Sequence, residues 1–238
     1  MKDLDSELML RALALGAGGD PTPNPHVGSV IVDAQGNVIA EGFHQAAGLD
    51  HAEMAALKKA GSAARGQTLY VTLEPCNHHG RTPPCVDAIL AAGIARVVIG
   101  CRDPDPRVQG GGIERLRAAG VEVVVGVQET EAKALIQPWA KYVTEHTSFI
   151  TLKLAISLDG RIATRTGASK WITSPEARLR VQTLRAHHDA VMVGINTVLT
   201  DNPRLTVRDT PGRNPIRVIV DSKPVSYTHL TLPTKRIV

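Results

Sequence analysis

Three short segments of the sequence are the most informative about the fold: His51-Ala52-Glu53, Glu74-Pro75-Cys76 and Pro83-Pro84-Cys85. A catalytic zinc ion takes three nitrogen or sulfur ligands from the protein, and its fourth tetrahedral position holds a water molecule whose pKa falls to roughly 7. We therefore predict that His51, Cys76 and Cys85 bind Zn2+ and that Glu53 moves protons. Each cysteine follows a proline, and we expect each to begin a helix, where the helix dipole favours the thiolate.

Around these segments, β-branched runs alternate with helical patterns. We predict a first hairpin and three further strands, at 27–33, 38–44, 68–73, 95–100 and 121–125, and helices at 4–15, 51–60, 85–92 and 113–119. This alternation predicts a three-layer α/β sandwich, with its sheet covered on both faces. Ligands of such folds bind beyond the carboxyl ends of strands, where Glu74, Cys76 and the loop after Gly100 fall.

Two less specific interpretations compete with a catalytic zinc site. Asp50 and Glu53 fit a capping box, in which Asp50 caps the helix and Glu53 reaches back to the Asp50 backbone. The metal could also be structural, with His78 or His79 as its fourth ligand. The two Pro-Cys steps, together with a histidine and a carboxylate two residues later, favour the catalytic interpretation.

Composition limits the classes of function. The chain has 238 residues, 43% of them hydrophobic, 21% charged and 3% aromatic, and a formal net charge of +4. We expect two soluble domains, because no apolar run approaches the ~20 residues of a membrane span. Aromatic platforms for single-stranded nucleic acid are scarce, so we expect no nucleic-acid or membrane partner. Three cysteines and an acidic N-terminus without an export signal indicate the cytoplasm, with Cys101 as a buried thiol.

Four segments resemble a known family: 23–28 (PNPHVG), His51-Ala52-Glu53, 74–85 (EPCNHHGRTPPC) and Asp103-Pro104-Asp105-Pro106. The H-x-E and P-C elements are typical of zinc-dependent nucleobase deaminases. The nine-residue step from Cys76 to Cys85 is similar to the deaminase domain of the bifunctional riboflavin-biosynthesis deaminase/reductase. Cytidine and tRNA adenosine deaminases have a shorter step, but the resemblance implies that the sandwich is of their cytidine-deaminase-like kind.

The resemblance implies hydrolytic deamination of a phosphorylated pyrimidine, 2,5-diamino-6-ribosylamino-4(3H)-pyrimidinone 5′-phosphate, with Glu53 as the proton shuttle. It also implies that Asn24 contacts the substrate, and less specifically that His44, His79 and Asp103 do so. Asn24 is alternatively a turn residue between two prolines. Deamination of another nucleobase or nucleotide and a non-catalytic, zinc-stabilised binding module stay open as alternatives.

The second half of the chain has its own pattern. A strand within 149–163 leads to a turn, Ser174 and Pro175 begin a helix that continues to about His187, and strands follow at 190–194 and 216–221. The motifs 152–160, 171–174 and 197–208 resemble the dihydrofolate-reductase-like reductase domain of the same family. That resemblance implies NADPH contacts from Ala155, Trp171, Thr197 and Asp201, and substrate contacts from Ser169, Arg185, Leu205 and Arg208.

The chain departs from that family near its C-terminus. We divide it into a zinc-dependent deaminase domain (1–146), the N-terminal part of a reductase domain (147–224) and a non-native tail (225–238), whose Val-Ser-Tyr-Thr-His-Leu reads like a translated sequencing adapter. A divergent native tail is the alternative. We therefore expect an incomplete reductase sheet with an unpaired edge, poor NADPH binding and no NADPH oxidation. The resemblance implies a homo-oligomer that is built partly through the reductase domain. We therefore expect this chain to form a homo-oligomer only if its part of the reductase domain is enough for assembly.

Overall fold

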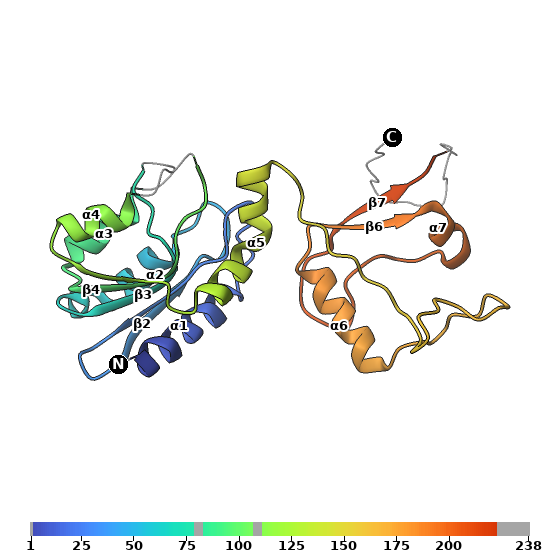
Figure 1. Cartoon of the computed structure of the whole chain (residues 1–238), viewed down its shortest axis with the longest axis horizontal. Coiled ribbons are helices and arrows are strands. Elements are labelled where there is room, and N and C mark those ends of the chain that lie inside the picture. The colour runs from blue at the N-terminus through green and yellow to red at the C-terminus, as the bar shows by residue number, and fades with distance from the viewer. Residues whose placement is uncertain (1, 79–82, 107–110, 223–238) are drawn as a thin grey trace. The chain divides into compact units, whose positions relative to one another are not determined.

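The computed structural model describes residues 2–78, 83–106 and 111–222 (Figure 1). The predicted tail and His79 lie outside these residues. The chain divides into two compact units, Met1–Thr151 and Leu152–Val238, which we call unit 1 and unit 2 and describe separately. Within the described residues, no helix is both long and apolar enough to cross a membrane.

Unit 1 contains a five-stranded sheet of order β2-β1-β3-β4-β5. The strands are β1 (Gly28–Val32), β2 (Val38–Phe43), β3 (Thr68–Leu73), β4 (Arg96–Cys101) and β5 (Glu122–Val125). β1 is antiparallel to both β2 and β3, whereas β3, β4 and β5 are parallel. The start of β1 and the ends of β2, β3 and β4 therefore meet at one edge of the sheet, which we call the upper edge.

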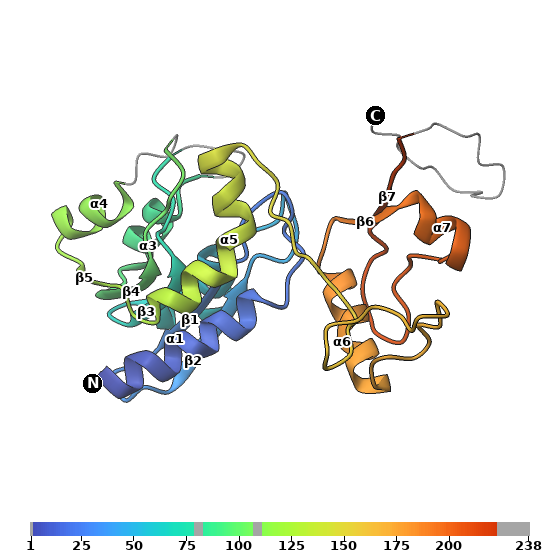
Figure 2. The same ribbon diagram turned by 45° about the vertical axis from the view of Figure 1, so that its right-hand side comes forward.

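Helices cover both faces of this sheet. α1 (Lys2–Gly16) and α5 (Glu129–Glu145) pack together over one face, as Figure 2 shows. α2 (Ala52–Ala60), the short 3-10 helix Gly61–Ala64 and α3 (Cys85–Ala92) lie on the other face, with α4 (Gly112–Ala118) beside α3. The predicted three-layer α/β sandwich is confirmed.

The core of unit 1 lies on both sides of the central strands. All five residues of β1 are buried, and Leu69 of the neighbouring β3 and Ile99 of β4 have no exposed surface. Burial of such a side chain stabilises the fold by about 1.5–3 kcal/mol. Close packing also requires glycine, because a Cβ at Gly28 would lie 1.9 Å from the Ala12 carbonyl oxygen of α1.

Three local predictions for unit 1 were wrong. Cys76 lies in an irregular loop rather than at the start of a helix, although Cys85 does begin α3. His51, not Asp50, is the N-cap of α2, and no side chain accepts a cap hydrogen bond there. Asp50 instead binds the Lys58 ammonium, which removes the basis for the capping box. The sequence reasoning also missed α5, which continues through Pro138.

Unit 2 contains α6 (Pro175–Ala186), β6 (Ala190–Gly194), α7 (Ile195–Asp201) and β7 (Ile216–Val220), and β6 pairs with β7 in parallel. Ser174 caps α6 as predicted, since its side chain accepts a hydrogen bond from Ala177 N at 3.2 Å. The strand predicted within 149–163 is not formed. Its apolar residues, such as Leu152 and Leu154, are exposed, because no neighbouring strand pairs with them in the described residues.

Candidate metal centre and active site

Three elements bring the predicted metal ligands together. His51 directly precedes α2, Cys76 follows β3 at the upper edge, and Cys85 is the first residue of α3. His51 Nδ1 lies 3.3 Å from Cys85 Sγ and 3.6 Å from Cys76 Sγ. The start of α3 is bonded directly to Cys76, because Cys85 N donates to Cys76 Sγ and Val86 N donates to Cys76 O.

These distances fit a zinc ion. With Zn–S of about 2.3 Å, Zn–N of about 2.0–2.1 Å and tetrahedral angles, the sulfur–nitrogen edge of a zinc site is about 3.5 Å. The two observed edges, 3.3 and 3.6 Å, lie on either side of that value. Among the described residues the cluster contains three ligand atoms, which all lie within 4.8 Å of one another. The described residues therefore form a three-ligand site with the dimensions of a zinc site.

The electrostatics of the three groups favour a cation. A hydrogen bond from the Cys85 thiol is the main cause that lowers the pKa of Cys76, to about 4, and a hydrogen bond from His51 adds to it. The Cys76 thiolate and burial in turn raise the pKa of Cys85 above its usual range. A bound dication stabilises both thiolates and removes this competition.

Glu53 lies beside the metal ligands without being one of them. It is in the first turn of α2, and its side chain is turned inward, so that the residue is only 4% exposed. Burial, followed by repulsion from Cys76, raises its pKa to about 7. Because a group with this pKa is able both to take and to release a proton near neutrality, Glu53 has the properties of an acid–base residue.

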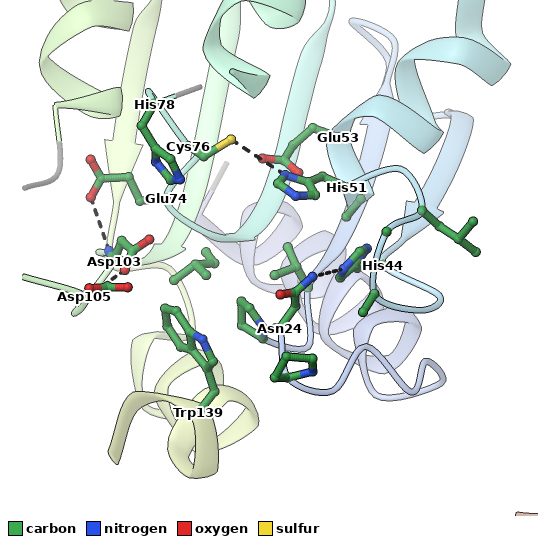
Figure 3. Close-up of a pocket in the computed structure, with 18 residues that line it drawn as sticks. Asn24, His44, His51, Glu53, Glu74, Cys76, His78, Asp103, Asp105 and Trp139 are labelled. Atoms are coloured by element: carbon green, nitrogen blue, oxygen red, sulfur yellow. Dashed lines mark hydrogen bonds between the residues drawn. The ribbon is translucent and has the colours of Figure 1, made fainter. Parts of the chain in front are cut away.

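A pocket of about 430 Å³ opens over these groups at the upper edge (Figure 3). Its lining includes His51, Glu53 and Cys76, so the predicted catalytic groups face one cavity. The register of the sheet explains why segments far apart in sequence meet here. Asn24 precedes β1 and His44 follows β2, while Glu74 and Asp103 follow the parallel strands β3 and β4.

Asn24 and His44 form a hydrogen-bonded pair in one wall of the pocket. Asn24 Nδ2 lies 2.9 Å from His44 Nε2, and His44 Nδ1 lies 3.0 Å from the carbonyl oxygen of Asp50. His44 is 2% exposed, and burial lowers its pKa. Both residues had been predicted at the substrate site, and the structure brings both to the pocket.

The opposite wall contains carboxylates that follow the parallel strands β3 and β4. The Glu74 carboxylate accepts hydrogen bonds from Asp103 N at 3.3 Å and Ile113 N at 3.2 Å. It thereby ties the loop after β3 to the loop after β4. Burial raises the pKa of the predicted residue Asp103 to about 6, and Asp105 lies next to it in the lining. Their position directly after two parallel strands was the available signal.

Trp139 and His78 complete the lining of the pocket. The sequence analysis offered His78 as an alternative metal ligand and did not predict Trp139 at the site. Trp139 lies on α5, which crosses to the pocket because α5 packs on β4. His78 belongs to the wall and is not in the cluster of ligand atoms.

The NADPH residues predicted in unit 2 do not form an enclosed site. Thr197 and Asp201 lie on α7, Ala155 lies in the unpaired segment, and Trp171 is 72% exposed. The Arg178 guanidinium covers the Trp171 ring at 4.4 Å from its centroid. Lys170 pairs with Asp201 at 3.8 Å.

Three of the predicted substrate residues of unit 2 lie near one another. Arg185 Nη1 donates to the Thr206 carbonyl oxygen at 2.7 Å and to Gln182 Oε1 at 3.5 Å. The same Gln182 oxygen accepts from Arg208 N at 3.1 Å, so one buried amide joins both arginines. Leu205 is buried beside them in the chain, whereas Ser169 is exposed.

The fold and the site together define the class, a deaminase-type zinc domain followed by a second, reductase-type segment. The family model for the cytidine and deoxycytidylate deaminase zinc-binding region matches residues 2–101, and the model for the RibD C-terminal domain matches residues 148–236. The chain is a homologue of the riboflavin biosynthesis protein RibD. It is 50% identical to RibD of Aquifex aeolicus over 224 residues, which cover 93% of this chain and 63% of the relative.

Two further comparisons agree. RibD of Escherichia coli strain K12 is 49% identical over 92% of this chain and 64% of its own length. The crystal structure of a Thermotoga maritima protein, described as a diaminohydroxyphosphoribosylaminopyrimidine deaminase/5-amino-6-(5-phosphoribosylamino)uracil reductase, superimposes with a TM-score of 0.87 at 49% identity. It covers 92% of this chain and 64% of that one. The chain thus spans somewhat less than two thirds of these relatives.

Proposed function

We propose that unit 1 catalyses the hydrolytic deamination of 2,5-diamino-6-ribosylamino-4(3H)-pyrimidinone 5′-phosphate, a step of riboflavin biosynthesis. The observation that carries this proposal is the cluster His51, Cys76 and Cys85, which faces the same pocket as the buried Glu53. The name of the Thermotoga maritima relative supports the choice of a diaminopyrimidine nucleotide.

The roles of the residues follow from their positions. Zinc held by the three ligands would supply Lewis acidity that activates a water molecule as the nucleophile. Glu53 takes one proton of that water and passes it to the ring nitrogen, and it then takes the second proton from the hydroxyl group formed on the carbon and delivers it to the departing amine. Water and the aminopyrimidine thereby become the ketopyrimidine and ammonia. Such a proton shuttle contributes typically 10²–10⁴-fold to the rate.

The remaining pocket residues would orient the substrate. Asn24 lines the pocket on one side, and Asp103 lines it on the other (Figure 3). Carboxylates and amide oxygens accept hydrogen bonds from amino groups, of which a diaminopyrimidine carries several. We therefore assign Asn24 and Asp103 to recognition of the base.

The NADPH-dependent reduction associated with the family is a separate question, and the described residues of unit 2 do not fit the cofactor. Trp171, Thr197 and Asp201 are exposed, and the Trp171 ring already stacks on Arg178. Cofactor sites bury most of their ligand in a preformed pocket. We propose that this chain does not oxidise NADPH, and turnover with the deaminated product would overturn that statement.

The same proposal includes the setting of the enzyme. The thiolate ligands Cys76 and Cys85 suit a reducing compartment, so we place the protein in the cytoplasm. Its partners would be the small phosphorylated substrate and, if unit 2 suffices for assembly, further copies of the chain. We assign it no nucleic-acid or membrane partner.

Ammonia release by the zinc-loaded chain tests the function. We expect turnover of the diaminopyrimidine nucleotide, no turnover of a tRNA adenosine substrate, and a loss of at least about 10²-fold for Glu53→Gln with zinc content unchanged. Activity on tRNA alone would make the protein a deaminase of another base. A fourth protein ligand on the metal, seen in the X-ray absorption spectrum, together with no turnover would make unit 1 a binding module.

A further inference from the structure

We propose that His44 is a positioning residue, which holds the Asn24 amide with its oxygen toward the pocket and so makes the site select a substrate with an N–H donor there. The inference rests on the proposed deamination in unit 1. It assigns His44 a role different from the substrate contact expected from the sequence.

The hydrogen bonds fix the polarity of each group in turn. The Asp50 carbonyl oxygen is only able to accept, so His44 Nδ1, 3.0 Å away, carries the proton. Asn24 Nδ2 lies 2.9 Å from the other ring nitrogen, Nε2, and an amide NH2 group is only able to donate, so Nε2 accepts. The Asn24 amide oxygen is therefore left for the pocket (Figure 3).

His44 is enclosed by the protein. The residue is 2% exposed, and its ring meets the His51 ring edge to face at a centroid distance of 5.3 Å. Both ring nitrogens are already bonded within the protein, so the substrate finds no free nitrogen on His44.

The hydrogen-bonded pair of Asn24 and His44 is also linked through the backbone to the metal site. Asp50, which accepts from His44, is the residue before the metal ligand His51. On its own side, Asn24 N donates to the Pro21 carbonyl oxygen at 2.8 Å, which holds the backbone of the turn. The Asn24 oxygen is thus held at a fixed distance from the metal ligands before the substrate arrives, and no binding energy is used to order it.

This polarity defines the chemical class that Asn24 recognises. An amide oxygen accepts from an exocyclic amine or a protonated ring nitrogen, and it repels a carbonyl oxygen or an unprotonated ring nitrogen. A substrate without a donor at this position would leave the Asn24 oxygen without a hydrogen bond, and sites that depend on such a bond discriminate strongly against that substrate. The diaminopyrimidine of the proposed reaction offers the required donor.

Two substitutions of His44 separate its two nitrogens. The glutamine of His44→Gln places its amide where Nε2 lies and is able to accept from Asn24. The shorter asparagine of His44→Asn reaches only the position of Nδ1 and is able to keep the bond to Asp50. We expect kcat/KM of the zinc-loaded chain to fall less than about 10-fold in the first variant and on the order of 10²-fold in the second, with the zinc content of both unchanged.

Long-range ¹H–¹⁵N spectra of the zinc-loaded wild-type chain give an independent readout, with the His44 signals identified by their loss in His44→Gln. We expect a protonated Nδ1 and an unprotonated Nε2. The opposite tautomer, or an equal loss of kcat/KM in the two variants, would overturn the role of His44. Absence of ammonia release from the wild type would instead overturn the proposed function, while the spectrum would still decide the orientation of Asn24.

Discussion

Units 1 and 2 bury their apolar residues to very different extents. Unit 1 closes a five-stranded sheet between helices, and Ile99 of β4 is completely buried. In its described residues unit 2 has a two-stranded sheet, and Ile216 of β7 is 55% exposed. A two-stranded sheet has little stability of its own. We therefore expect unit 1, which contains the metal ligands, to contribute most of the free energy of unfolding.

Among the substitutions that test this difference, removal of a metal ligand from unit 1 has the largest expected effect. Cys76→Ala leaves two of the three zinc ligands, so we expect zinc content, measured by atomic emission after dialysis, to fall from one per chain to near zero. Cys101→Ala is the matched control, because Cys101 is a buried thiol whose sulfur donates to the Thr72 carbonyl oxygen at 3.6 Å. Equal zinc loss in both variants would show that general unfolding, and not ligation, controls the metal.

A matched pair of isoleucines tests the contrast in packing directly. We expect Ile99→Ala to lower the free energy of unfolding of unit 1 by about 2–5 kcal/mol, because it opens a cavity in the core. Ile216→Ala should change the stability of unit 1 by less than about 0.5 kcal/mol. Urea unfolding in a Trp171→Phe background measures both, since Trp139 packs against the unit 1 core and is then the only tryptophan. Similar losses in both variants would mean that the two units unfold as one.

The same contrast explains how much could be predicted from the sequence. In unit 1 the strand and helix patterns near the site gave the correct elements, because each apolar face is buried against a neighbour and the periodicity reports that burial. In unit 2 the alternation of Leu152, Leu154 and Ile156 predicted a strand, but alternation alone cannot supply a partner. The strand is absent for that reason.

The metal ligands could be predicted because their chemistry is carried by residue type and spacing. The pocket walls could not be predicted in the same way. Trp139 reaches the site because α5 packs on the sheet, and α5 was not predicted because it contains Pro138. Glu74 accepts a hydrogen bond from the Ile113 backbone N–H. Such contacts depend on the register of parallel strands and leave no local pattern in the sequence.

A buried ion pair provides the next smaller effect within unit 1. Asp5 accepts from the Tyr70 hydroxyl at 2.6 Å and from both Nη atoms of Arg96, at 3.0 and 2.9 Å. The hydrogen bonds from Arg96 are the main cause that lowers the pKa of Asp5. We expect Asp5→Asn to reduce the free energy of unfolding by about 1–3 kcal/mol at pH 7.

The pH dependence of that loss follows from the sign of the shift. A carboxyl whose pKa is lower in the folded state stabilises the fold above its ordinary pKa of about 4, and this contribution disappears as the pH falls through the lower, folded value. Urea midpoints of the wild type and Asp5→Asn should therefore converge in acid. Glu122→Gln is the control, because Glu122 binds the same Arg96 at 3.0 Å but is 63% exposed, so its loss should cost less than about 1 kcal/mol. Parallel curves for wild type and Asp5→Asn down to acid pH would contradict this account.

The smallest effect concerns the helix cap of unit 2. Ser174→Ala removes the acceptor of the Ala177 N–H, and loss of such a cap typically costs about 1 kcal/mol. Since unit 2 has few buried apolar residues, this cost is a larger share of its stability than the same cost would be in unit 1. We expect faster amide exchange in α6 of the variant and unchanged exchange in α1. Ser169→Ala, at an exposed position outside any helix, should leave both unchanged. Protection of α1 that falls together with that of α6 would show that the two units share one unfolding transition, and the contrast between them would then be one of burial alone.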